Sequence, residues 1–143
     1  MLSTFFTIRR KLLGNKASRQ PGLEDPDPLT LWNFIPKIIP YVLPFFDAPH
    51  RRVHWSLEIL GVDPAHHGKG FGKELVQDGL TRINACPDDL PVAVISADGK
   101  ETFYQKMGFK ELVGWVSKTK GPDGSDNPLR ANGVGGGAVL WTR

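Results

Sequence analysis

The sequence predicts one mixed α/β domain with a parallel crossover, carried by the middle of the chain. Residues 53–116 alternate in pattern as strand, helix, strand, helix, strand. The length of 143 residues suits one small domain, and 40% hydrophobic with 23% charged residues is an ordinary globular composition. Strands joined by a helix lie parallel in one sheet. We therefore expect a central sheet with flanking helices.

The first strand and helix of this middle region have distinct periods. Val53–Val62 alternates as a strand, with one unusually polar face. From Phe71 the apolar residues follow helical spacing, and this helix ends near the letters "NACP". A short apolar run, Pro91–Ala97, predicts a strand covered on both faces.

The next elements carry end signals. Asp98, with Glu101 three residues later, resembles a capping box that opens a helix through "KETFYQKM". Gly108 is placed to end that helix. Phe109–Val116 predicts a further strand, and "AVLWTR" at the chain's end predicts a short closing strand.

We expect residues 1–50 to form a basic, proline-rich arm with an apolar segment, and residues 51–143 to form the core. "STFFTIRR" is the one candidate strand in the arm. The apolar segment, Leu31–Phe46, is too short and too rich in proline for a membrane span. Residues 120–137 predict a glycine- and proline-rich loop, which is either functional or disordered.

Charge and cysteine content narrow the function class. A net charge of +3 is too mild for a nucleic-acid protein and equally suits a small polyanion. The single Cys86 excludes an internal disulfide framework and favours a reduced compartment, so we expect a cytoplasmic protein. The first 20 residues lack a secretory signal pattern. Their basic character is shared by mitochondrial transit peptides, which is the minor alternative.

The segment "DPAHHGKGFGK", residues 63–73, combines a strand end, glycines at alternate positions and a helix start, an arrangement that can bind an anion. The Walker pattern fails because Asp63 stands at its first glycine and Gly70 at its hydroxyl position. The dinucleotide pattern fails because Lys73 or Leu75 stands at its third glycine. A tight turn that needs glycine for positive φ is the structural alternative.

The segment "HGKGFG" resembles the acyl-CoA loop Q/R-x-x-G-x-G/A of the GNAT superfamily of N-acyltransferases, with His67 in place of Gln or Arg. "WSLEILGVDPAHHGKGFGKELV" is similar to that family's fourth strand, loop and third helix, and "FYQKMGF" to its Y-x-x-x-G-F segment. The resemblance covers about Trp55 to Val116, and its spacing is most similar to fungal members.

The resemblance implies acetyl-CoA as cofactor and an amine as acceptor. The pyrophosphate would rest on the loop amides, with charge from two lysines, and the pantetheine arm and thioester would enter between splayed strands Val53–Val62 and Pro91–Ala97. The implied cofactor-binding residues are Leu60, Gly61, Val62, His67, Gly68, Lys69, Gly70, Phe71, Gly72 and Lys73.

Direct attack by an amine needs a base and an acid. Glu58 on the polar strand face is the first candidate base and His54 the second, whereas Glu58 is otherwise a solvated or ion-paired strand residue. Tyr104 falls where many family members place the acid that protonates the CoA thiolate, and its alternative is a core aromatic. Trp55, Phe34 and Phe45 are expected to wall the acceptor pocket.

The four histidines, His50, His54, His66 and His67, do not have metal-ligand spacing, so we expect no metal site. His67 is expected to donate to a phosphate or to pack the loop. Family members place three strands and two helices before the fourth strand, and this chain has 52 residues there. Missing strands would expose a sheet edge that a second copy, as a homodimer, or another partner would cover.

Three functions stay open from the sequence. The first is N-acetyl transfer from acetyl-CoA to a small amine. The second is a GNAT-like fold repurposed for a different step on a small apolar metabolite in natural-product biosynthesis, held against Leu31–Phe46. The third is a shortened, non-catalytic domain that binds a partner through an exposed edge.

Overall fold

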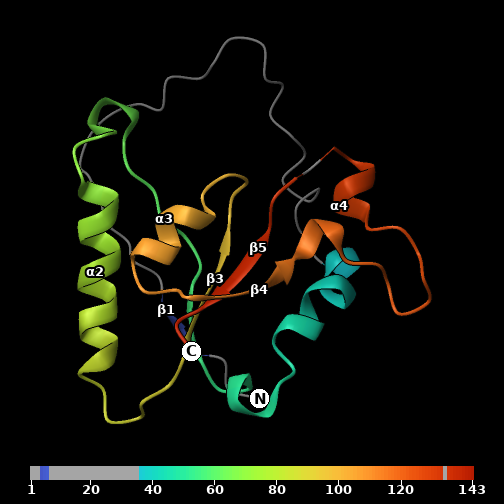
Figure 1. The fold of residues 1–143 in the computed structure, drawn as a ribbon, viewed down its shortest axis with the longest axis horizontal. Coiled ribbons are helices and arrows are strands. Elements are labelled where there is room, and N and C mark those ends of the chain that lie inside the picture. The colour runs from blue at the N-terminus through green and yellow to red at the C-terminus, as the bar shows by residue number, and fades with distance from the viewer. Residues whose placement is uncertain (1–3, 7–35, 134) are drawn as a thin grey trace.

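The computed structural model describes residues 4–6, 36–133 and 135–143, and of residues 4–6 it describes the backbone alone. Figure 1 shows a twisted sheet with helices on both faces. The strands are β1 (Thr4–Phe6), β2 (Trp55–Leu57), β3 (Val92–Ser96), β4 (Glu111–Trp115) and β5 (Ala138–Trp141). The α-helices are residues 36–42, α2 (Phe71–Asn84), α3 (Glu101–Lys106) and α4 (Pro128–Ala131). Short 3₁₀ turns are η1 (Leu43–Phe45), η2 (Pro49–Arg51), η3 (Pro64–His66) and η4 (Val116–Lys118).

The sheet has five strands in the order β1-β2-β3-β5-β4, which confirms the mixed α/β class. β1, β2 and β3 are parallel, and α2 supplies the predicted crossover between the last two. β5 runs antiparallel to both neighbours. The strand predicted to close the chain is therefore central, and all four of its residues are buried.

The core lies on both faces of the sheet. On one face α2 and α3 cover Leu57, Val92, Val94 and Leu140. On the other face the helix at residues 36–42 and the turn after it cover a second apolar cluster: Tyr41, Ala93, Val116, Val139 and Trp141, with Val42, Phe45 and Phe46 packed against it. Residues 36–46 therefore belong to the same packed unit as the core.

Two predicted element starts need correction. The strand Val53–Val62 is reduced to β2 (Trp55–Leu57), because residues 58–62 leave the ladder. Asp98 does not cap α3, whose N-cap is Lys100 without a side-chain cap. The chain first turns through Gly99, at φ +69°, and Asp98 packs beside residues 135–136 instead. α2 has its predicted bounds, and α3 ends two residues before Gly108, which has φ +110°.

β4 contains a bulge at the place where Phe45 packs against the sheet. Leu112 pairs with Leu140 and Gly114 with Val139, so Val113 is the extra residue. Gly114 has φ +153°, and a Cβ built on it would lie 2.6 Å from Cε1 of Phe45. The glycine therefore lets the turn after the helix at residues 36–42 pack directly on the sheet.

We expect Gly114→Ala to lower the free energy of unfolding by about 1–3 kcal/mol, because the added methyl group overpacks the Phe45 ring. Urea unfolding measures this change. In a Phe45→Leu background the same substitution should cost less, since the close ring atoms are gone. An equal cost in both backgrounds would contradict the contact.

Candidate functional site

The pairing of β2 with β3 ends before β3 does, and the region between the two strands beyond the last pair is called the gap below. Their parallel ladder ends at the pair Leu57 and Val94, whereas β3 continues to Ser96 and pairs there only with β5. Beyond the last pair, Ile59 is 65% exposed and Ile95 is 45% exposed, although both are apolar. Two neighbouring parallel strands therefore diverge at their carboxyl ends, as the resemblance implies for a pantetheine slot.

The glycine segment lies at the same end of the sheet, between β2 and α2 (Figure 1). Asp63 caps the 3₁₀ turn η3 by accepting from the Ala65 amide at 2.8 Å. Nε2 of His67 lies 2.8 Å from the Val62 carbonyl, to which it donates. The ring of His67 therefore ties the segment back to the residues that leave β2.

Left-handed backbone at two glycines brings the chain into α2. Gly68 has φ +74° and Gly70 has φ +86°, and nothing lies within 4 Å of a Cβ built on either. The amide of Glu74 makes the first helical bond, to the Gly70 carbonyl at 3.1 Å. The three preceding amides, of Phe71, Gly72 and Lys73, have no intrahelical acceptor and add their partial positive charge to the helix dipole.

The two lysines of this segment remain exposed. Nζ of Lys69 donates to the Ala65 carbonyl at 3.1 Å and lies 3.3 Å from Nδ1 of His66. Lys73 is exposed on the first turn of α2 and pairs with no acid among the described residues. Together the free amides, open space and two cations can hold a polyanion such as a pyrophosphate.

Glu58 is the first residue after β2. Its carboxylate is exposed and makes no hydrogen bond or ion pair with the described part of the chain. By strand alternation it belongs to the face of Ser56, which pairs with Ala93, and Ile95 projects to that same face. Glu58 therefore stands just beyond the last β2–β3 pair, on the face of the sheet that carries Ala93 and the second apolar cluster.

His54 lies at the other end of β2, in an aromatic cluster. Its Nδ1 lies 2.7 Å from the Arg51 carbonyl, and its ring centroid is 5.3 Å from that of Phe46 and 5.1 Å from that of Trp141. Four residues of extended chain separate it from Glu58 by about 13 Å. His54 therefore packs beside the amino-terminal end of β2, away from the gap.

Tyr104 lies on α3, next to the glycine segment. A Cβ on Gly72 would lie 3.8 Å from Cζ of Phe103, so the start of α2 touches α3. The Tyr104 ring is buried, with its centroid 5.0 Å from that of Phe103 and 5.8 Å from that of Phe109. Burial raises the pKa of the phenol above its ordinary value of 10.0.

Of the backbone groups expected near a thioester, Leu60 is half-buried against the core, whereas Gly61 is exposed with open space at its Cα. Within the described residues their amides donate to no other backbone group. The three aromatics expected around the acceptor are placed differently. Trp55 packs against the α2 face at the far end of β2, Phe45 packs on Gly114, and Phe34 lies outside the described residues.

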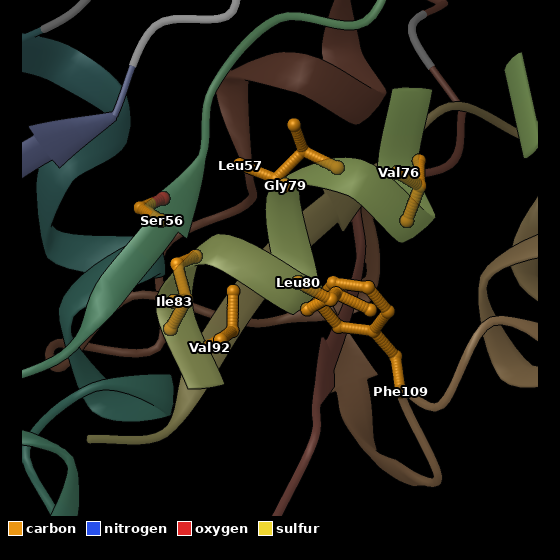
Figure 2. Close-up of a pocket in the computed structure, with 8 residues that line it drawn as sticks. All are labelled: Ser56, Leu57, Val76, Gly79, Leu80, Ile83, Val92 and Phe109. Carbon is orange, nitrogen blue, oxygen red and sulfur yellow. The ribbon is translucent and has the colours of Figure 1, made fainter. Parts of the chain in front are cut away.

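A small apolar cavity lies under α2, lined by residues of β2, α2 and β3 and by Phe109, which precedes β4 (Figure 2). Its volume of about 10 Å³ barely reaches that of one water, so it is a packing gap and not a ligand site. Its walls are Ser56, Leu57, Val76, Gly79, Leu80, Ile83, Val92 and Phe109.

Two further properties concern the described residues alone. They include no group of three or more His, Cys, Asp or Glu residues placed to hold a metal ion. None of their helices combines the length and apolar character that crossing a membrane requires.

Because the Tyr104 phenol is buried, we expect the folding stability to fall at alkaline pH. Below pH 10 Tyr104 is protonated in both states, and above it the unfolded chain loses this proton first, so folding stability falls. We expect wild type to lose more unfolding free energy than Tyr104→Phe between about pH 9 and pH 11, measured by urea unfolding. Identical pH slopes in the two proteins would contradict this.

Comparison with known families identifies the family of the chain. Residues 49–121, just over half of the 143-residue chain, match the family model described as "Acetyltransferase (GNAT) domain". Neither the curated proteins nor the solved structures gave a match. The matched residues contain β2, the glycine segment, α2, β3, α3 and β4, and so include the strand gap and the free amides. The chain belongs to the GNAT acetyltransferase family.

Proposed function

We propose that this protein transfers an acetyl group from acetyl-CoA to an amine by direct attack. Membership of the GNAT family supports acetyltransferase-type activity in general. The observation that carries the specific proposal is the unbonded first turn of α2 beside the end of the β2–β3 ladder. These two features lie at the same end of the sheet, as binding of one extended cofactor would require.

The glycine segment fits the diphosphate of coenzyme A. A side chain at Gly68 or Gly70 would project into open space, and both positions have positive φ. The amides of Phe71, Gly72 and Lys73 would hold the diphosphate, with Lys69 adding charge. His67 keeps the segment in place through the Val62 carbonyl.

When bound, acetyl-CoA supplies the acetyl group as a thioester. The amine must attack as the neutral base, and Glu58, exposed at the gap without a partner among the described residues, would accept its proton. The amides of Leu60 or Gly61 would donate to the developing oxyanion. Tyr104 would give a proton to the leaving thiolate, because a phenol is protonated at neutral pH.

The metabolite alternative has less support. The apolar segment expected to hold such a compound packs on the sheet, where Tyr41 is buried and Phe45 and Phe46 join the second apolar cluster.

We expect millimolar acetyl-CoA to raise the melting temperature of wild type, because a ligand at a hundredfold excess over its dissociation constant stabilises by about 2.7 kcal/mol. Gly70→Asp should abolish the rise, since a carboxylate there repels the diphosphate. Gly124→Asp is the matched control, because Gly124 has φ +79° and open space in a distant loop. No rise in wild type, or an equal rise in both variants, would end the cofactor assignment.

We expect Glu58→Gln to lower kcat by about 10²–10⁴-fold while the melting rise with acetyl-CoA persists, because the amide accepts no proton from the amine. Release of free CoA thiol with a panel of primary amines measures turnover. Glu101→Gln, an equal charge change on α3, should leave kcat near that of wild type. A Glu58→Gln enzyme with unchanged kcat at neutral pH would remove Glu58 as the base.

A further inference from the structure

The loop at residues 120–137 contributes to the lining of a second hollow. Its volume is about 340 Å³, and its lining residues are Ser117, Lys118, Arg130 and Gly135. They come from η4, from α4 and from the segment that leads into β5. The hollow shares no residue with the strand gap or with the glycine segment.

Two cations line this hollow, and neither pairs with an acid among the described residues. Nζ of Lys118 lies 4.0 Å from the ring centroid of Trp115, which holds the ammonium in place without neutralising it. Arg130 is exposed in the last turn of α4. The neighbouring Lys120 instead lies 3.9 Å from Asp126. The two positive charges at the hollow are therefore available to a ligand.

The walls of the hollow are held by buried hydrogen bonds. The side chain of Asn127 donates to the carbonyls of Val116 and Thr119, and it accepts from the Leu129 amide at 2.9 Å. The Ser117 hydroxyl donates to the Gly136 carbonyl at 2.6 Å. These bonds fix η4, α4 and the segment before β5 relative to one another, so the two cations stand on a built frame.

The same frame is attached to the edge of the sheet where the gap opens. The Gly137 amide donates to the Ser96 carbonyl at 3.0 Å, at the carboxyl end of β3. A Cβ on Gly135 would lie 3.2 Å from Oδ2 of Asp98, which follows β3. In the sheet, β5 lies between β3 and β4, so two strand spacings, roughly 10 Å, separate β3, which borders the gap, from β4, which runs into η4 at the hollow.

We propose that this hollow binds the carboxylate of the acceptor, which is a peptide-like zwitterion with about 10 Å between amine and carboxylate. This rests on the proposed acetyl transfer at the gap. Lys118 and Arg130 would hold the carboxylate by charge-assisted hydrogen bonds. Asp98, on the side toward β3, repels a carboxylate and attracts an ammonium. The charge order therefore directs the amine end toward the gap.

The test compares ligands that differ only in the carboxylate. Glycine to tetraglycine and their C-terminal amides span the required length, since three extended residues cover about 10 Å. Calorimetry without acetyl-CoA gives their dissociation constants. We expect wild type to bind the best-fitting acid at least about fivefold more tightly than its amide, and Arg130→Gln with Lys118→Met to bring that ratio close to one.

Lys110→Gln is the matched control, because this exposed lysine precedes β4 and so lies at the opposite end of that strand from η4. It should keep the wild-type ratio. Equal binding of acid and amide by wild type, or an unchanged ratio in the double variant, would overturn the assignment. Acid preference without any acetyl-CoA melting rise would leave the carboxylate site standing and remove the acetyltransferase proposal. A melting rise with acetyl-CoA but no preference for the acid would leave the acetyltransferase proposal standing and remove the carboxylate site.

Discussion

The structure depends on where the ladder between β2 and β3 ends. Up to the pair Leu57 and Val94 the two parallel strands share hydrogen bonds and bury apolar side chains under α2. Beyond it, β3 keeps only β5 as a partner, and residues 58–62 depart from the sheet. Backbone amides and the Glu58 carboxylate are thereby left without protein partners at one edge, among the described residues. A continuous ladder would have satisfied those amides and closed the gap.

At the other end of the same strands, charge and aromatic packing hold the sheet together. The guanidinium of Arg51 is 8% exposed, lies 2.5 Å from a carboxylate oxygen of Glu111 and stands 4.9 Å from the Trp141 ring centroid. Removing Glu111 would leave the buried charge of Arg51 uncompensated, which is destabilising. His54 completes this cluster and anchors η2 through the Arg51 carbonyl. One end of the sheet is therefore closed by packing, and at the other end the β2–β3 ladder stops short.

The loop at residues 120–137 also has a structural role that its composition does not convey. The Tyr41 hydroxyl lies 2.8 Å from the Ser125 hydroxyl and donates to the Asp126 carbonyl, which joins the loop to the helix at residues 36–42. Gly136 passes so close to Asp98 that a Cβ would lie 2.6 Å from its amide nitrogen. The glycines allow this contact because any side chain would collide with backbone. The loop thus connects the second apolar cluster to the open edge of the sheet.

The sequence by itself determined the elements whose signals are local. The helical period predicted α2 with its bounds, the apolar run predicted β3, and the glycine segment with "FYQKMGF" indicated the family. Tertiary structure decided what depends on distant partners. β2 is shorter than the alternating segment Val53–Val62, because a strand extends only as far as a neighbouring strand pairs with it. The segment "AVLWTR" forms a central strand, because β3 and β4 pair with it on its two sides. His54 packs against Trp141, and Phe45 packs on Gly114. Lys118 and Arg130 line one hollow because the fold brings η4 and α4 together, which no sequence spacing encodes.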